Sequence, residues 1–319
     1  MRELGKCGIS ATVIADSVTL DGRRMTTMEI EYPRFILAEL NTHRMLSKNS
    51  ASSRAIPVNS MHESIRTAGA QPVYWGKNQA GMQAKEELQG SDKSMAKYTW
   101  AVARDVAIKF AKELAELGTH KQITNRVTEP WMMMKTVISG TEWGNFYYLR
   151  DHEDAQPEIA ELARVMHKAH KDSKPLLLHP GEWHVPYVTT YRHLATGELM
   201  YSDGVGCEIS ADDAKIISAS CCAQVSYRKN DDSLEKAQKI FQQLIYSKPA
   251  HASPVEHQAT PMDLAYYMNY EPETWEPGVT HVSANGDLWS GNLRGWIQHR
   301  KLITDEANWD PVAYEEWQA

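Results

Sequence analysis

The spacing of apolar residues changes repeatedly along the chain, and each spacing predicts a different kind of element. In residues 25–32, Met28, Ile30 and Tyr32 alternate with other residues, as in a half-buried strand that ends at Pro33. Further along, apolar residues recur every three or four positions, which is typical of helices that bury one face. The helices predicted from this spacing span residues 35–46, 97–117, 119–150, 157–171, 212–226, 233–245 and 293–303.

The helix predicted over residues 97–117 has an amphipathic pattern. Gly118 follows it at the position where a glycine usually ends a helix. Its predicted buried face consists of Trp100, Ala103, Val106, Phe110, Leu114 and Leu117.

Several segments show neither the alternation of a strand nor the spacing of a helix, and they are interpreted as loops. Residues 47–60 are rich in Ser, Asn and Pro, and residues 70–93 form a polar surface excursion. Residues 175–210 are interpreted as a connector or insertion with short strands at 185–191 and 199–201, and 269–290 as a loop. The predicted fold class is α+β, mostly helical with a small antiparallel sheet.

Composition and charge narrow the classes of function. The chain has 319 residues, of which 42% are hydrophobic, so it can bury a sizeable core. Its net charge of −7 argues against a broad nucleic-acid surface, which requires clustered Lys and Arg. A single nucleotide remains possible, because a few arginines suffice to bind a phosphate.

The cysteines and the apolar runs point to a cytoplasmic protein. Four cysteines occur without CxxC spacing, so no metal site is expected, and Cys221 and Cys222 are interpreted as helix packing. Neither a signal peptide nor an apolar run of about 18 residues is found, so no membrane association is expected.

A first cluster of candidate binding residues spans the end of the helix predicted at 35–46 and the loop that follows it. Hydroxyl groups and guanidinium groups are the donors that bind phosphates, although such a segment can also be a solvated loop. The cluster comprises His43, Arg44, Ser47, Asn49, Ser52 and Arg54.

This cluster resembles the signature RHRxxSxNExSxR of flavin-dependent thymidylate synthases (ThyX) and matches it without a gap. Two positions differ, because Thr42 replaces the first Arg and Ser50 replaces Glu. The resemblance implies that Ser52 and Arg54 bind the nucleotide, that His43 contacts flavin, and that Arg44 contributes to both sites.

A second resemblance covers residues 125–130, 145–150 and 155–159, in the order and approximate spacing of the family. It implies that Arg126 and Arg150 contact the nucleotide. Asn145 then faces the flavin. Without the resemblance, the simplest interpretation of Arg150 is a surface ion pair with Asp154 four residues later.

A third resemblance is out of order. Ala223-Gln-Val-Ser226 and His251-Ala-Ser-Pro-Val-Glu-His257 resemble elements that precede the arginine motif in the family, which predicts a circularly permuted chain. It implies that Ser226, Ser253 and Glu256 bind FAD. His251 and His257 can also be loop histidines or an incomplete metal pair.

A fourth segment, residues 292–300, resembles a second copy of the arginine motif with Gln298 in place of Arg. It implies flavin contacts from His299 and Arg300, with a duplicated element or a chance similarity as alternatives. The predicted organisation is a nucleotide-binding half (1–171), a connector (172–210) and a flavin-binding half (211–319), packed as one domain.

The resemblance implies reductive methylation of dUMP at C5, with FAD as the hydride carrier and with NADPH and methylenetetrahydrofolate as co-substrates. Arg150 is the predicted catalytic residue, since it would stabilise negative charge on the uracil ring. A homo-oligomer, a tetramer by resemblance, is expected. Three alternatives remain: dCMP as substrate, a hydroxymethyl product, and a non-catalytic nucleotide- or flavin-binding paralogue.

Overall fold

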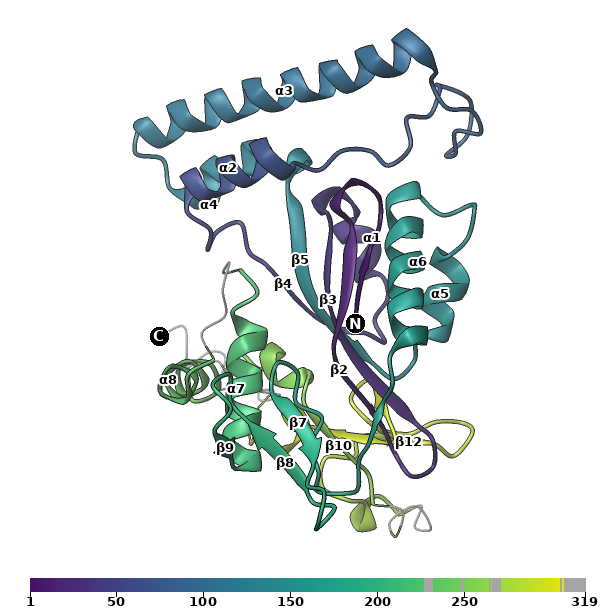
Figure 1. Ribbon diagram of the computed structural model, residues 1–319, viewed down its shortest axis with the longest axis vertical. Coiled ribbons are helices and arrows are strands. Elements are labelled where there is room, and N and C mark those ends of the chain that lie inside the picture. Colours follow the sequence, from purple (N-terminus) through teal and green to yellow (C-terminus); the bar gives the residue numbers. More distant parts are fainter. Residues whose placement is uncertain (227–231, 248–249, 264, 266–270, 305, 307–319) are drawn as a thin grey trace, which may run out of the picture.

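A mostly antiparallel sheet forms the centre of the molecule (Figure 1). The computed structural model describes residues 1–226, 232–247, 250–263, 265, 271–304 and 306. In spatial order, the strands of this sheet are β1 (Arg2–Leu4), β2 (Ser10–Val18), β3 (Arg24–Pro33), β5 (Met133–Gly140) and β4 (Ser47–Ser50). A sixth strand, β6 (Leu176–Leu177), pairs parallel with β2.

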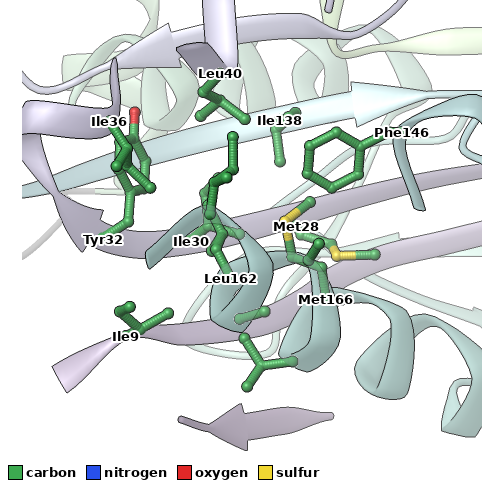
Figure 2. Close-up of a cluster of buried hydrophobic side chains, with 14 of the residues drawn as sticks. Ile9, Met28, Ile30, Tyr32, Ile36, Leu40, Ile138, Phe146, Leu162 and Met166 are labelled. Atoms are coloured by element: carbon green, nitrogen blue, oxygen red, sulfur yellow. The ribbon is translucent and has the colours of Figure 1, made fainter. Parts of the chain in front are cut away.

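One face of the sheet is covered by α5 (Gly144–Arg150) and α6 (Pro157–Asp172). Figure 2 shows Met28, Ile30 and Tyr32 of β3 on the side where Leu162 and Met166 of α6 lie. All five side chains are fully buried, so the period-two pattern of β3 and the helical pattern of α6 meet in one core.

A helical layer lies at one end of the sheet (Figure 1). It contains α2 (Val58–Ala68), the long α3 (Gly90–Glu116), α4 (Lys121–Thr124) and the 3-10 helix η3 (Asn125–Trp131). Met61 and Ile65 of α2 pack with Ile108 of α3 and with Met132. The short α1 (Leu37–Asn41) follows the 3-10 helix η2 (Arg34–Ile36) directly after β3.

The carboxy-terminal part lies at the opposite end of the molecule from α3 (Figure 1). Among its described residues, the helices are α7 (Ala211–Ala223), α8 (Leu234–Ile245) and the 3-10 helices η4 (Ser253–Glu256), η6 (Pro272–Thr274) and η7 (His299–Leu302). Its small antiparallel sheets are β7 (Thr189–Arg192) with β8 (Leu199–Ser202) and β9 (Glu208–Ile209), β10 (Ala259–Pro261) with β14 (Trp296–Gln298), and β11 (His281–Val282) with β12 (Leu288–Ser290) and β13 (Leu293–Arg294).

The α+β class is confirmed, and so are several of the predicted elements. The strand at 25–32 is β3, the helix at 157–171 is α6 with Pro157 in its first turn, and the helix at 233–245 is α8. Gly118 follows α3 with a φ of +81°, a left-handed conformation that favours glycine. No helix among the described residues is long and apolar enough to cross a membrane.

The prediction of one helix over residues 119–150 is wrong. The segment forms α4, η3, the central strand β5 and only then α5. The mainly apolar segment from Met132 to Ile138, interrupted only by Lys135 and Thr136, is compatible with either a buried helix or a strand buried on both faces. Residues 133–140 form a strand because they pair with β3 on one side and with β4 on the other.

The predicted helix at 35–46 and the loop at 47–60 also differ from the structure. The helix ends at Asn41, His43 and Arg44 lie in the turn that follows, and residues 47–50 form the edge strand β4. The four residues Ser, Lys, Asn and Ser have a low intrinsic propensity for β-strands. Hydrogen bonding to β5 therefore stabilises the strand conformation of this segment.

Two other predictions need correction. Residues 293–303 form β13, β14 and η7 instead of one α-helix. The loop predicted at 269–290 contains the strands β11 and β12 within residues 281–290. Residues 269 and 270 of that loop lie outside the described part. On α3 the predicted buried face is largely exposed: Val106, Phe110 and Leu117 are 46%, 52% and 81% exposed.

Candidate functional site

The edge strand β4 and the turn after it bring distant parts of the chain together. Side chains alternate along the strand, so Asn49 points toward α7 and its Nδ2 donates to the backbone oxygen of Cys222 at 3.1 Å. Two residues beyond β4, the backbone N–H of Ser52 donates to Ser226 Oγ at 2.8 Å. A predicted nucleotide residue and a predicted flavin residue are therefore direct neighbours.

On the other side of β4, Lys48 lies near a group of charged side chains from the carboxy-terminal part. Its Nζ donates to the backbone oxygens of His43 at 2.5 Å and Leu46 at 2.8 Å. Burial lowers the pKa of Lys48 to about 8, although the nearby carboxylate of Glu256 opposes this shift. Lys48 occupies an unspecified position of the arginine motif, so the sequence carries no signal for it.

Glu256 and Arg300, both predicted to bind flavin, form an ion pair between η4 and η7. Arg300 also donates from Nε to Glu306 at 2.6 Å. Its guanidinium is therefore largely neutralised by two carboxylates. Ser253 begins η4 and is exposed, with no side-chain hydrogen bond to any described residue.

Arg150, the predicted catalytic residue, lies at the end of α5 and contacts α1 and the turn after it. Its Nε donates to Nε2 of His43 at 2.8 Å, and its Nη1 pairs with the carboxylate of Glu39. Because α5 ends at Arg150, Asp154 does not lie one helical turn further on, and the pair with Asp154 is not formed. Glu39 lies four residues before His43 and was missed by the sequence reasoning.

His43 is buried between Arg150 and Phe146, whose ring it meets edge-on with centroids 4.9 Å apart. Burial, and then the positive charge of Arg150, lower the pKa of His43 to about 4. The imidazole is therefore neutral at physiological pH. Since an arginine can only donate, Nε2 of His43 is the acceptor and the ring proton is on Nδ1.

Arg54 and Arg126 extend from a common junction near η3. Asn125 is fully buried, and its Nδ2 donates to the backbone oxygens of Ser53 at 2.7 Å and Ile56 at 3.0 Å. These bonds hold the loop after β4 against the start of η3. The Arg126 side chain is 62% exposed and lies 3.6 Å from Glu129, and the Arg54 side chain is also exposed.

The other predicted residues occupy different surroundings. Arg44 and Asn145 are exposed, and within the described ranges neither side chain has a hydrogen-bond or ion-pair partner. His299 packs edge-on against Trp183 at 5.4 Å and stacks on Phe241 at 6.1 Å. Burial lowers the pKa of His299 to about 4.

A buried chain of hydrogen bonds behind the site was not predicted. Ser17 Oγ contacts His184 Nδ1 at 2.8 Å, His184 Nε2 contacts Thr27 Oγ1 at 2.8 Å, Thr27 contacts Ser139 Oγ at 2.6 Å, and Ser139 contacts His257 Nδ1 at 2.8 Å. His257 is completely buried, so it is not a surface loop histidine. Among the described residues, no group of three or more His, Cys, Asp and Glu side chains is placed to hold a metal ion.

The predicted site residues thus fall into several separate groups of contacts. Within the part of the chain that is described, no hydrogen bond or ion pair joins Arg54, Arg126 and Arg150 to one another. Three surface hollows of about 560, 360 and 390 Å³ are lined by other residues, around α3 and around Lys6. Convergence of these arginines on one nucleotide remains a prediction.

Comparison with known proteins gives one family match. The model of Thy1, described as thymidylate synthase complementing protein, matches residues 24–176. No curated protein matches the sequence. The permuted elements at 223–226 and 251–257 lie outside the matched residues, so the permutation stays a prediction.

Two solved structures of a UMP/dUMP methylase, PolB from Streptomyces cacaoi, resemble the fold weakly. The one bound with 5-Br dUMP is 19% identical, with a TM-score of 0.40, and the match covers 48% of this chain and 68% of that chain. The one bound with 5-Br UMP is 18% identical, with a TM-score of 0.43, and the match covers 53% and 90%. The family model of thymidylate synthase complementing proteins thus matches this chain from β3 to β6, just under half of its length.

Proposed function

We propose that this chain is an enzyme that methylates C5 of a pyrimidine nucleoside monophosphate, and specifically a flavin-dependent thymidylate synthase acting on dUMP. The match of residues 24–176 to the Thy1 family model supports the proposal. Methylenetetrahydrofolate supplies the one-carbon unit and NADPH the reducing equivalents. The products of this reaction are dTMP, tetrahydrofolate and NADP⁺.

The observation that carries the proposal is the contact between Ser52 and Ser226, 174 residues apart in the chain. Ser52 belongs to the arginine motif and Ser226 to the out-of-order Ala-Gln-Val-Ser element. Two segments that resemble separate parts of one family signature thus meet at a 2.8 Å hydrogen bond. A circular permutation preserves such spatial neighbours while changing their order in the chain.

Arginine side chains in the segments before and after β4 fit anionic ligands with phosphate groups. Arg44 and Arg54 are exposed, and neither guanidinium pairs with a carboxylate of the described chain. Arginine binds phosphate oxygens through paired N–H donors. We assign Ser52, Arg54 and Arg126 to the nucleotide, Arg44 to both ligands, and Ser226, Ser253, Glu256, His43, Asn145, His299 and Arg300 to FAD. When bound, reduced FAD supplies the hydride that completes the methyl group.

Arg150 is the proposed catalytic residue. The guanidinium has five N–H groups, of which the bonds to His43 and Glu39 use two. The remaining N–H groups can donate to the O4/N3 edge of a pyrimidine, where negative charge develops as C5 becomes nucleophilic. Glu39 and His43 hold the guanidinium in place before the ligand arrives, which is the preorganisation that makes such a donor effective.

The cysteines suit a mechanism without a thiolate nucleophile. Cys221 and Cys222 are buried in α7, and burial raises the pKa of Cys222 well above its usual value. A buried neutral thiol is a poor nucleophile. The Arg150 guanidinium then has to stabilise the ring charge that a thiolate adduct would otherwise carry.

One departure from the family pattern favours a related substrate as the second candidate. Ser50 stands where the family has Glu, and its hydroxyl lies 2.8 Å from Thr136 Oγ1 on the neighbouring strand. The site therefore lacks a carboxylate at this position, and dCMP or a hydroxymethyl product is the alternative. A non-catalytic paralogue is the third candidate.

We also propose that residues 1–171 and 211–319 form two halves of one domain, joined by the connector 172–210.

An absorbance spectrum of the purified protein tests the proposal. We expect flavin bands after reconstitution with FAD and a change in these bands on addition of dUMP, with smaller changes for dCMP and UMP. A larger response to dCMP selects the second candidate. Protein that takes up no FAD contradicts the proposed enzyme and favours a nucleotide-binding paralogue.

A further inference from the structure

Three segments that are distant in the chain meet at the turn between α1 and β4. Nδ2 of Asn292 donates to the backbone oxygen of Met45 in this turn at 3.0 Å. The hydroxyl of Ser47, where β4 begins, lies 3.2 Å from Oδ1 of Asn292. The 3-10 helix η4 also packs against β4. The arginine motif therefore meets both resembling segments of the carboxy-terminal part here, and we call this place the turn junction.

Gln298 connects the two carboxy-terminal segments of the turn junction. Its Nε2 donates to Oδ1 of Asn292 at 3.0 Å and to the backbone oxygen of Glu256 at 3.3 Å. Gln298 is buried, and its backbone N–H donates to Oγ of Ser290 at 3.0 Å. Side-chain hydrogen bonds therefore fix the position of η4 relative to the turn.

The ammonium group of Lys48 lies within the turn junction. It donates to the backbone oxygens of His43 and Leu46 in the turn, and the negative charge of Glu256 acts on it from η4. An ammonium group has three N–H donors, of which these bonds use two. Burial disfavours the charged form and lowers the pKa of Lys48 to about 8, so a further anionic partner would stabilise it. The third N–H can therefore bind a ligand.

The turn itself carries less positive charge than the motif that it resembles. Thr42 stands where the motif has an arginine, and the imidazole of His43 is neutral, so Arg44 is the one charged side chain of residues 42–46. The Thr42 hydroxyl donates to the backbone oxygen of Glu39 at 2.7 Å. Lys48 reaches back from β4 to the residue after Thr42 and returns a positive charge to the turn.

We propose that Lys48 is a cofactor-binding residue, whose ammonium group holds a negatively charged group of FAD at the turn junction and replaces the charge absent at Thr42. The proposal rests on the flavin-dependent function proposed above. FAD carries a diphosphate, and its reduced ring is anionic at neutral pH, so both groups suit a partly buried cation. Removal of the charge should weaken FAD binding independently of any effect on catalysis.

Substitutions can separate the charge of Lys48 from its bonds to the backbone. Lys48→Gln keeps an N–H donor but has no charge, so the dissociation constant of FAD should rise roughly tenfold or more. Lys48→Arg keeps the charge and should stay within about threefold of the wild type. Thr42→Arg in the Lys48→Gln background should recover most of the lost affinity, because it returns the charge to the same turn.

Lys121→Gln is the matched control for the loss of a lysine. The ammonium group of Lys121 also donates to a backbone oxygen, that of Ala55 at 3.1 Å, and Lys121 is also partly buried. We expect its dissociation constant for FAD to equal that of the wild type. Fluorescence titration of the full chain with FAD measures all these affinities, and far-UV circular dichroism checks that each variant is folded.

The midpoint potential of bound FAD identifies the group that Lys48 holds. A more negative potential in Lys48→Gln assigns the ammonium group to the reduced ring, whereas weaker binding at an unchanged potential assigns it to the diphosphate. Unchanged affinity and potential, beside a wild type that binds FAD, would overturn the role of Lys48 and leave the proposed function intact. Weaker binding that Thr42→Arg does not recover would show that Lys48 only holds the turn. A wild type that takes up no FAD would refute both proposals.

Discussion

Nε of Arg150 donates a hydrogen bond to Nε2 of His43 at 2.8 Å, while Glu39 pairs with Nη1 of the same guanidinium. The neutral imidazole is held in one tautomer, because its Nε2 can only accept here. The pair connects the end of α5 to the turn before β4. His43 belongs to the arginine motif and Arg150 to the second resembling segment, so the hydrogen bond joins two parts of the proposed site.

The first prediction concerns Arg150. Arg150→Ala should still bind FAD but lose at least tenfold in tritium release from C5-labelled dUMP. Removal of one preorganised donor typically costs roughly 10²–10³ in rate. The matched control is Arg164→Ala, whose guanidinium pairs with Glu161 on α6 and is half exposed. Unchanged release in Arg150→Ala would refute the catalytic role.

A second prediction separates the two ligands. Ser52→Ala and Arg54→Ala should weaken dUMP binding while FAD remains bound. Loss of a charge-assisted hydrogen bond costs about 1.5–3 kcal/mol, so we expect the dissociation constant of dUMP to rise roughly 10- to 150-fold in Arg54→Ala. Isothermal titration of the FAD-loaded protein measures this change. Arg66→Ala, on an exposed part of α2, is the control. Loss of flavin before loss of nucleotide means that the assignment is reversed.

The third prediction tests the absence of a thiolate nucleophile. Cys221→Ser and Cys222→Ser should remain active within a few-fold of the wild type. Both side chains are buried, and Cys222 Sγ accepts a long contact of 3.8 Å from Nε2 of Gln258. Tritium release and a melting curve should be measured on the same samples. A folded but inactive variant would indicate covalent attack on C6.

The fourth prediction follows from the buried histidines. Burial lowers the pKa of His184 to about 4 and that of His257 to about 3, below the ordinary value of 6.5. The unfolded chain therefore takes up protons first as the pH falls below 6.5, and stability is lost between pH 6.5 and the folded pKa values. Each histidine should contribute a loss of roughly 2 kcal/mol by pH 5.

Urea unfolding at pH 7.5, 6.5, 5.5 and 5.0 measures this loss. His184→Asn should be less stable than the wild type at pH 7.5, because it breaks the bonds to Ser17 and Thr27, yet it should lose less stability on acidification. His193→Asn, at an exposed position, should follow the wild-type slope. A parallel slope for His184→Asn would show that this imidazole is not the titrating group.

Local patterns predicted several elements correctly because their signals lie within a few residues. β3 alternates with period two, α6 begins with a proline in its first turn, and Gly118 takes the positive φ that ends α3. The family resemblance also depended only on local order and spacing, and the match over residues 24–176 agrees with it.

The sequence by itself thus determined the residue types of the motifs, the α+β class and the elements with one clear period. Tertiary structure alone decided that residues 133–140 form a strand, that the apolar row of α3 faces outward, and that Ser52 meets Ser226. The physical reason is that each of these outcomes depends on the partner of a segment. An apolar run suits a helix or a central strand, and a helix with two apolar faces can bury either one. Only the packing of distant segments selects between these possibilities.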